Sequence, residues 1–387
     1  MCARGNARND SSLMSPKPVL LMVRALELGG SERQMAELAQ ALDKSEFAAH
    51  VGCFHDDGFR AQELRQAGIP ILVLPVRSFM AFNALRGAWR MGQYIRRHGI
   101  QLVHTFDLPL TIFGVPVARA FGVPVVLSSQ RANRNLQPRY HRLARLTDHL
   151  AHGIVVNCEA MRRHMIEDEG APPERVHVCF NWIDIEHYRP LPPLRPPPVA
   201  GASLVIGVVC ALRPEKGLLT LVDAFAQVRD AAPGMKLLIV GDGPMLPVLE
   251  ERAREHGLGA QCVFQPAVAD VREWLREIDI FVLPSLSEAL SNSLLEAMAS
   301  GCTTVASLVG GNPELVEDGK TGLLFTPGDA ANLGRQLGSL IASESLRKQL
   351  SESSLSFVRE HFNKDTSVRH LQELYRSFLK PKKLAGR

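Results

Sequence analysis

The stretch IFVLPSLSEALSNSLLEAMASG (280–301) decides the fold of this chain. It begins with a short apolar run, passes through small and polar residues, and ends in the helical pattern LLEAMA. A buried strand that leads through a loop into a helix is the repeating unit of parallel α/β sheets. The stretch has two charged residues, Glu288 and Glu296, with seven residues between them. They are either a capping acid and an exposed helical acid, or carboxylates that a ligand's hydroxyl groups satisfy.

Eleven more apolar runs of this kind recur along the chain, and helical patterns at 30–42, 220–231, 245–257 and 293–301 lie between them. This alternation predicts an α/β fold of two doubly wound, Rossmann-like domains that face each other across a cleft. The twelve predicted strands are 18–23, 48–54, 70–74, 101–106, 124–129, 153–158, 203–210, 236–241, 262–266, 280–285, 302–307 and 322–327.

The segment 188–203 contains six prolines, which exclude a helix or a central strand, so we interpret it as a linker. It separates a predicted N-terminal domain (17–187) from a C-terminal domain (204–362). The final segment, 363–387, is predicted to be a helix and a tail, and this helix could return to the first domain. Residues 1–16 are polar and lack the apolar region of a signal peptide, so we expect a disordered leader.

Composition limits the possible settings of the protein. The seven cysteines are scattered and odd in number, without a C-x-x-C pair, which argues against disulfides and zinc and favours a reducing cytoplasm. No apolar run approaches the roughly 20 residues of a membrane-spanning helix. The net charge is only +4, but 77–145 holds eleven arginines and one acid, a local charge of +10. Such asymmetry concerns binding partners rather than the fold.

Ligands in open parallel sheets lie at the carboxyl ends of strands, and two loops with small residues occur there. Gly29 and Gly30 follow the first strand and precede Ser31, so their amides could hold a phosphate, although ordinary helix capping would also explain them. Gly241 and Gly243 follow the strand at 236–241, where they allow either a ligand or a tight turn.

Charged residues mark two further loops. Arg213 and Lys216 follow the strand at 203–210, where they could neutralise a diphosphate or could be solvated surface charges. In the opening stretch, Glu288 lies on the loop and Glu296 about one turn into the helix, both able to face the same cleft. The amides of three residues between them would point into that cleft, namely Ala289, Leu290 and Ser291.

At these residues the chain resembles the retaining glycosyltransferases of family 4 (glycosyl transferases group 1), which have the GT-B fold. The resemblance covers about 18–375 and is carried by LRPEKG, LIVGDGP, FVLPSLSEALSNSLLEAMASG and VGGNPELVEDGKTGLLF. In the first half, LGGSER is similar to the glycine loop of the family.

The resemblance implies a nucleotide-diphosphate sugar donor bound to the second domain and an acceptor bound to the first. Glu296 would hold the ribose hydroxyls, and Glu288 those of the transferred sugar. The diphosphate would lie at Arg213 and Lys216, with Gly29 and Gly30 approaching from the first domain. The base would contact the loop of Pro266 and Val268, with Gly243 nearby. The implied transfer retains the anomeric configuration by front-side attack and needs no metal and no cofactor besides the donor.

Three positions depart from the family pattern. Ala211 stands where an arginine is usual, so Arg213 could replace that arginine. Gln130, where histidine is frequent, can hydrogen-bond a sugar hydroxyl but cannot take a proton. Trp182 stands where glycine is usual, which could reshape that turn. On the acceptor side we name His104, Arg131 and Arg134 as candidates, with a structural role as the alternative for His104.

The arginine-rich segment suggests the chemistry of the acceptor. Residues 79–99 mix large apolar side chains with arginines, a pattern that can bind an anionic membrane surface. We therefore predict an anionic or lipid-linked saccharide acceptor, with peripheral membrane contact through 77–145 at the inner face of the cytoplasmic membrane. The alternative is a solvated basic face with its apolar residues packed inward. Few aromatic residues are available for base stacking, which argues against nucleic acid.

Two other functions remain open from the sequence. The same fold could carry a sugar-nucleotide epimerase, which would need acid and base groups facing the sugar from the first domain. It could also carry a non-catalytic sugar-nucleotide-binding protein, as Ala211 and Gln130 allow. Either would lack the transfer step to an acceptor.

Overall fold

The N-terminal half is built on a parallel sheet in the order β3-β2-β1-β4-β5-β6-β7. The computed structural model describes residues 15–27, 29–76, 82–131 and 138–380. The sheet order reverses between β1 and β4, which places the carboxyl ends of these strands at a typical ligand-binding point. The strands are β1 (Lys17–Met22), β2 (Phe47–Cys53), β3 (Ile71–Val73), β4 (Leu102–Thr105), β5 (Val125–Gln130), β6 (Gly153–Val156) and β7 (Val176–Val178).

The C-terminal half is built on a second parallel sheet, in the order β10-β9-β8-β11-β12-β13. Here the order reverses between β8 and β11, so the loops after these strands converge. The strands are β8 (Val205–Val209), β9 (Lys236–Val240), β10 (Cys262–Gln265), β11 (Ile280–Leu283), β12 (Thr303–Ser307) and β13 (Leu323–Phe325).

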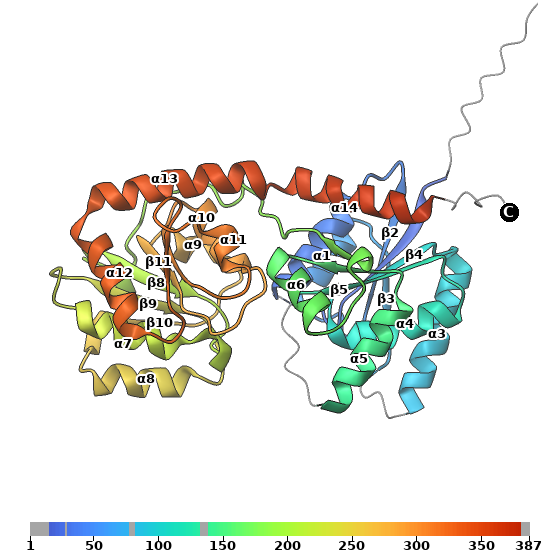
Figure 1. Ribbon diagram of the computed structural model, residues 1–387, viewed down its shortest axis with the longest axis horizontal. Coiled ribbons are helices and arrows are strands. Elements are labelled where there is room, and N and C mark those ends of the chain that lie inside the picture. The colour runs from blue at the N-terminus through green and yellow to red at the C-terminus, as the bar shows by residue number, and fades with distance from the viewer. Residues whose placement is uncertain (1–14, 28, 77–81, 132–137, 381–387) are drawn as a thin grey trace, which may run out of the picture.

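Helices cover both faces of the N-terminal sheet (Figure 1). One face packs against α1 (Gly30–Ala41), α2 (Phe59–Gln66) and α14 (Lys364–Leu379) in one apolar core. The other face packs against α3 (Phe82–His98), α4 (Leu108–Ala120) and α5 (Pro138–Leu150) in a second core. Helix α6 (Glu159–Glu167) instead shares its buried residues with the core of the C-terminal half.

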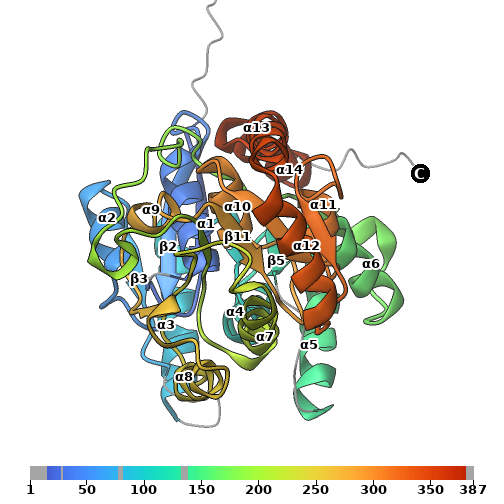
Figure 2. The ribbon, with the colours of Figure 1, turned by 90° about the vertical axis from the view of Figure 1, so that its left-hand side faces the viewer.

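The C-terminal sheet is also covered on both sides (Figure 2). Helices α7 (Leu218–Val228), α8 (Leu246–Glu255) and α12 (Ala330–Ala342) pack together, while α10 (Asn292–Ala299) packs against α13 (Glu344–His361). Two short helices, α9 (Arg272–Leu275) and α11 (Asn312–Leu315), complete this half. The two halves therefore have the doubly wound α/β architecture that the sequence predicts.

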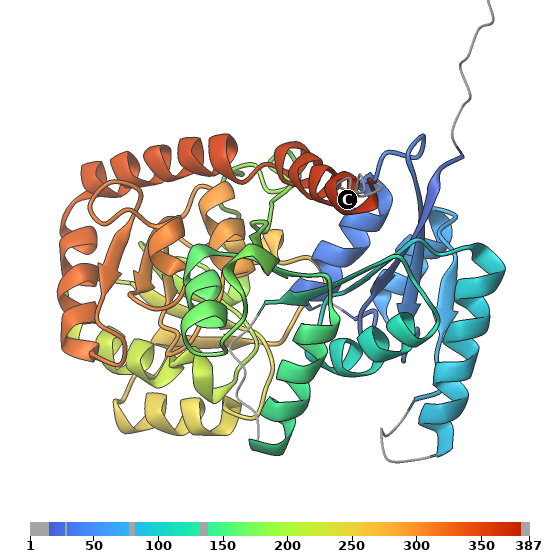
Figure 3. The same ribbon diagram turned by 45° about the vertical axis from the view of Figure 1, so that its right-hand side comes forward.

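The C-terminal helices join the two halves. Helix α13 lies along the C-terminal half, and α14 continues the chain onto the N-terminal half beside α1 (Figures 1 and 3). Tyr375 of α14 is fully buried there and donates or accepts a 2.6 Å hydrogen bond with His104 Nδ1, while Arg376 pairs with Glu46 at 2.7 Å. The predicted return of the terminal helix to the N-terminal half is confirmed.

The twelve predicted strands match β1–β6 and β8–β13, and one strand was missed. The missed strand, β7, is the segment VHV after a 3₁₀ turn at Pro173–Arg175, and His177 interrupts its apolar pattern. The proline-rich 188–203 contains a 3₁₀ turn at Pro197–Val199 but no α-helix or strand. Of the predicted leader, 1–14 lie outside the described residues. Among the residues that the structure describes, no helix is long and apolar enough to cross a membrane.

Candidate functional site

The loop between β11 and α10 brings Glu288 and Lys216 together. Lys216 ends the 3₁₀ turn Pro214–Lys216, and its Nζ donates to Oε1 of Glu288, which also accepts from Ser285 Oγ at 2.8 Å. Gly217 allows this approach, because a Cβ there would lie 2.2 Å from the carbonyl oxygen of Pro284. The Glu288 side chain is 11% exposed, so the ion pair is largely shielded from water. Two predicted site residues, far apart in sequence, thus form one charged unit.

Glu296 forms an ion pair with the other half of the molecule. Arg33, in the first turn of α1, donates from Nη1 to Glu296 Oε1 and to Tyr188 Oη, the latter at 2.8 Å. Both side chains of the ion pair are about nine-tenths buried. Burial alone would lower the pKa of Arg33, but the adjacent Glu296 carboxylate raises it above its ordinary value. Arg33 therefore stays charged and links α1 to α10.

The N-termini of α1 and α10 meet at Gly30. A Cβ on Gly30 would lie 2.4 Å from Nδ2 of Asn292, the first residue of α10. Asn181 bridges the same region, since its Nδ2 donates to Asn292 Oδ1 at 3.0 Å and to the carbonyl oxygen of Leu290 at 3.3 Å. Arg131, after β5, donates to Asn181 Oδ1 at 2.8 Å. Two helix N-termini, both favourable to anions, thus converge between the halves.

The loop after β9 contacts the loop after β10. Asp242 accepts from the backbone N–H of Ala267 at 3.0 Å, which places the candidates Pro266 and Val268 beside the VGDGP turn. Gly243 has φ +157°, and a Cβ there would lie 2.4 Å from the carbonyl oxygen of Leu212. The close packing of two backbones therefore explains this glycine, as the tight-turn alternative proposes. Arg213 is exposed at this edge.

His104, one of the acceptor-side candidates, lies inside the fold. His104 is 0% exposed, and its two ring nitrogens contact Tyr375 Oη at 2.6 Å and Ser129 Oγ at 2.8 Å. Burial also lowers the pKa of His104 well below its usual range. The structure therefore agrees with the structural alternative for His104 and not with a place on the acceptor side, because Tyr375 of α14 covers it. Gln130 is buried at the end of β5, and Arg134 lies outside the described residues.

Arg131, another acceptor-side candidate, lies where the two halves meet, because it donates to Asn181, which in turn contacts the start of α10. Its guanidinium lies 4.8 Å from the centre of the Phe106 ring, and burial lowers its pKa to about 10. Trp182, the departure from the family turn, is buried and donates from Nε1 to Glu37 at 2.8 Å. The large ring is thus anchored on α1, next to the Arg33 ion pair.

Sequence reasoning missed several residues of this region. Glu314 of α11 accepts from the backbone N–H groups of Glu159 and Ala160 at 2.8 and 2.7 Å, so it caps α6 across the halves. Arg33 lies inside the quoted LGGSER motif, but a first-turn arginine gave no sign of its distant partner. The other missed residues are Tyr188, Asn181 and Asn292.

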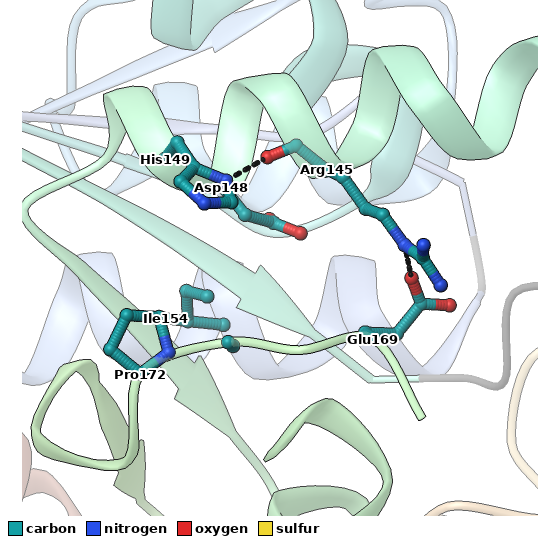
Figure 4. A pocket seen from close by; sticks show the side chains of 7 residues that line it. Arg145, Asp148, His149, Ile154, Glu169 and Pro172 are labelled. Carbon is teal, nitrogen blue, oxygen red and sulfur yellow. Dashed lines mark hydrogen bonds and ion pairs between the residues drawn. The ribbon is translucent and has the colours of Figure 1, made fainter. Parts of the chain in front are cut away.

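One cavity in the described part of the chain lies away from this region. A cavity of about 10 Å³, enough for a single water molecule, lies between α5 and the segment after α6 (Figure 4). It is lined by Arg145 and Glu169, which form an ion pair at 2.9 Å, and by His149. Within the described residues, no group of three or more His, Cys, Asp or Glu side chains is arranged to hold a metal ion.

The architecture matches that of two solved structures. HepE of Anabaena, solved in complex with UDP and glucose, superimposes with a TM-score of 0.81 over 93% of this chain and 99% of HepE, at 23% identity. Sucrose-phosphate synthase of Thermosynechococcus elongatus gives a TM-score of 0.79 over 93% of this chain and 98% of that protein, at 18% identity. These similarities establish the GT-B fold.

Family models match most of the chain. The Glycosyltransferase Family 4 model matches residues 28–187, and the Glycosyl transferases group 1 model matches residues 203–343. The chain therefore belongs to the family 4, group 1 glycosyltransferases.

Two curated relatives agree with this assignment. EpsF of Bacillus subtilis (strain 168) is 27% identical over 307 residues, which are 76% of this chain and 79% of EpsF. The lipopolysaccharide core biosynthesis glycosyltransferase LpsE of Rhizobium meliloti is 31% identical over 150 residues, which are 39% of this chain and 43% of LpsE. The match to LpsE thus spans less than half of that protein.

Proposed function

We propose that this glycosyltransferase moves a sugar from a nucleotide-diphosphate donor to an anionic or lipid-linked saccharide, with retention of the anomeric configuration. The observation that carries the proposal is that the segment between β11 and α10 and the helix after it carry both Glu288, paired with Lys216, and Glu296, paired with Arg33, and that α10 begins against Gly30 of α1. The diphosphate would lie at Lys216 and Gly30, the transferred sugar at Glu288, and the ribose at Glu296. Arg213, Pro266, Val268 and the 289–291 amides would complete the donor site.

The relatives support a role in cell-surface polysaccharide or glycolipid synthesis. LpsE is named for lipopolysaccharide core synthesis, and HepE was solved with UDP and glucose. UDP sugars are therefore the first donors to test. The proposed reaction uses no metal, because cations and helix N-termini already neutralise the diphosphate.

A panel of UDP, GDP and ADP sugars, incubated with the protein and with EDTA, tests this function. We expect one donor to release its nucleoside diphosphate slowly, and the released or transferred sugar to keep its anomeric configuration in an NMR time course. An epimer without nucleotide release would support the epimerase instead. Saturable binding without turnover would support a non-catalytic protein, and activity lost with EDTA would contradict the metal-free mechanism.

Helix α3 supports a membrane-facing role for the N-terminal half. Phe82, Leu85 and Trp89 are 90%, 68% and 60% exposed, although they are large apolar residues at helical spacing. Arg86 and Arg90 are exposed beside them. The apolar side chains therefore do not all pack inward, which favours an anionic membrane surface at the inner face of the cytoplasmic membrane.

Liposome flotation tests this membrane contact. We expect the protein to float with vesicles rich in phosphatidylglycerol at low salt and to stay at the bottom with neutral vesicles. The Trp89→Ser variant should lose most of this binding, while Val248→Ser, at an exposed apolar residue of the other half, serves as the control. Equal flotation of the two variants would contradict the assignment to α3.

A further inference from the structure

Arg33 has an unsatisfied donor in a buried place. Its Nη1 contacts Glu296 and Tyr188, and its Nε lies 3.7 Å from Glu37 Oε1. Its Nη2 is buried and has no hydrogen-bond partner among the residues that the structure describes. An unpaired N–H of a buried guanidinium is costly, so this donor is suited to a hydrogen-bond acceptor on a ligand.

We propose that Arg33 completes the ribose site from the N-terminal half and selects ribonucleotide donors over deoxyribonucleotide donors. The inference rests on the proposed function, in which Glu296 binds the ribose. A ribose hydroxyl both donates and accepts, so it can donate to the Glu296 carboxylate while its oxygen accepts from Nη2 of Arg33. Because Nη1 engages Oε1 of Glu296, Oε2 remains for the neighbouring hydroxyl. A deoxyribose would leave Nη2 unsatisfied.

Neighbouring side chains hold the guanidinium in this orientation. Tyr188 receives one hydrogen bond from Nη1, and its ring centre lies 5.7 Å from the guanidinium carbon. Glu37 faces Nε and is itself fixed by Trp182 Nε1 at 2.8 Å. An arginine held in place on two sides loses little side-chain entropy when it binds a ligand, so its free donor is well suited to discrimination.

The proposal makes tight donor binding depend on both halves of the molecule. Glu296 belongs to α10 and Arg33 to α1, so neither half alone contains the full set of ribose contacts. In this proposal the N-terminal half contacts the donor as well as the acceptor. A purely structural ion pair would link the halves equally well without affecting the choice of nucleotide.

Calorimetric titration tests the inference. UDP, GDP and ADP are titrated into the wild-type protein, and the tightest is compared with its 2′-deoxy and 3′-deoxy counterparts. We expect the wild type to prefer the ribonucleotide by about tenfold, since each lost charge-assisted hydrogen bond has roughly that effect. Arg33→Gln should bind the ribonucleotide more weakly and show a smaller preference over at least one deoxy form, with Glu296 as the remaining source of discrimination.

Two further variants keep the test decisive. Arg33→Lys retains a cation beside Glu296 but has no planar second donor. It should therefore fold and show a reduced preference even if Arg33→Gln fails to fold. Tyr188→Phe removes only the support and should reduce the preference less than either arginine variant. Weaker binding with the full preference intact in both arginine variants would overturn the proposal. Absence of any nucleotide binding by the wild type would instead overturn the proposed function, and this inference with it.

Discussion

The two glutamates of the opening stretch should fail in different ways when each is changed to glutamine. Glu288 Oε1 already accepts from Lys216 and Ser285, which leaves Oε2 for one hydroxyl of the transferred sugar. Glu288→Gln therefore removes about one charge-assisted hydrogen bond at the reacting sugar, about 1.5–3 kcal/mol. This corresponds to a loss of about 10-fold to 100-fold in kcat.

Glu288→Gln should not weaken the binding of the nucleoside diphosphate, in contrast to its effect on kcat. Without the carboxylate, Lys216 is released from its ion pair and can face the diphosphate more fully. We therefore expect the nucleoside diphosphate to bind Glu288→Gln as tightly as the wild type or more tightly.

Glu296→Gln has a different expected profile. It weakens the ribose contact and leaves Arg33 buried without its carboxylate. Breaking a buried ion pair in this way costs about 3–5 kcal/mol of folding stability, and we expect nucleotide affinity to fall about tenfold with kcat little changed.

Steady-state kinetics with the active donor, together with calorimetric binding of its nucleoside diphosphate, separate these effects. Glu250→Gln, at an exposed acid of α8, is the matched control and should behave as the wild type. Equal and small effects of Glu288→Gln and Glu296→Gln would refute the site assignment. So would a Glu288→Gln variant that loses nucleotide binding but keeps kcat.

Three further predictions follow from single contacts. Gly30→Ala places a methyl group 2.4 Å from Asn292 Nδ2, so kcat should fall about tenfold, and Asn292→Ala in the same chain should restore part of it; no rescue in donor kinetics would contradict this contact. Glu314→Ala leaves two N–H groups of α6 without an acceptor, so urea unfolding should show a loss of about 1–2 kcal/mol, and an unchanged midpoint would contradict the cap. Burial raises the pKa of the Asp107 carboxyl from 3.8 to about 6. The protonated carboxyl therefore stabilises the folded protein fully below pH 4, and this stabilisation is lost as the pH rises through 6. Asp107→Asn, which can still accept from Leu110, should gain up to about 3 kcal/mol over the wild type between pH 4 and pH 8, and a difference independent of pH would exclude this titration.

The sequence predicts the fold well because its signals are local. Strands such as β8 (VIGVV) and β11 (IFVL) are continuous apolar runs, and the loop-to-helix change before α10 is marked by Ser291, which caps the helix through Leu294 N–H at 3.3 Å. The same kind of signal places Lys216 and Glu288 at neighbouring strand ends. Strand β7 has no such run, because His177 is the middle one of its three residues.

The rest of the site depends on contacts between distant parts of the chain. Arg33 and Glu296 are 263 positions apart, and no local pattern reveals that they meet. His104 lies near the carboxyl end of a parallel strand, where ligands usually bind. Helix α14 nevertheless covers it, and Tyr375 Oη forms a hydrogen bond with its Nδ1. Such contacts depend on how the two halves and the last helix pack together. The periodicity of apolar residues and the spacing of motifs do not predict this packing.

The most direct test of the donor site is a crystal structure of the protein with the nucleoside diphosphate that it binds most tightly. The account predicts the ribose hydroxyls on Glu296 with Arg33 beside them, and the diphosphate between Lys216 and Gly30 at the N-termini of α1 and α10. A nucleotide bound elsewhere, for example on the exposed groove of Leu219 and Val248 between α7 and α8, with the Arg33–Glu296 pair untouched, would contradict it.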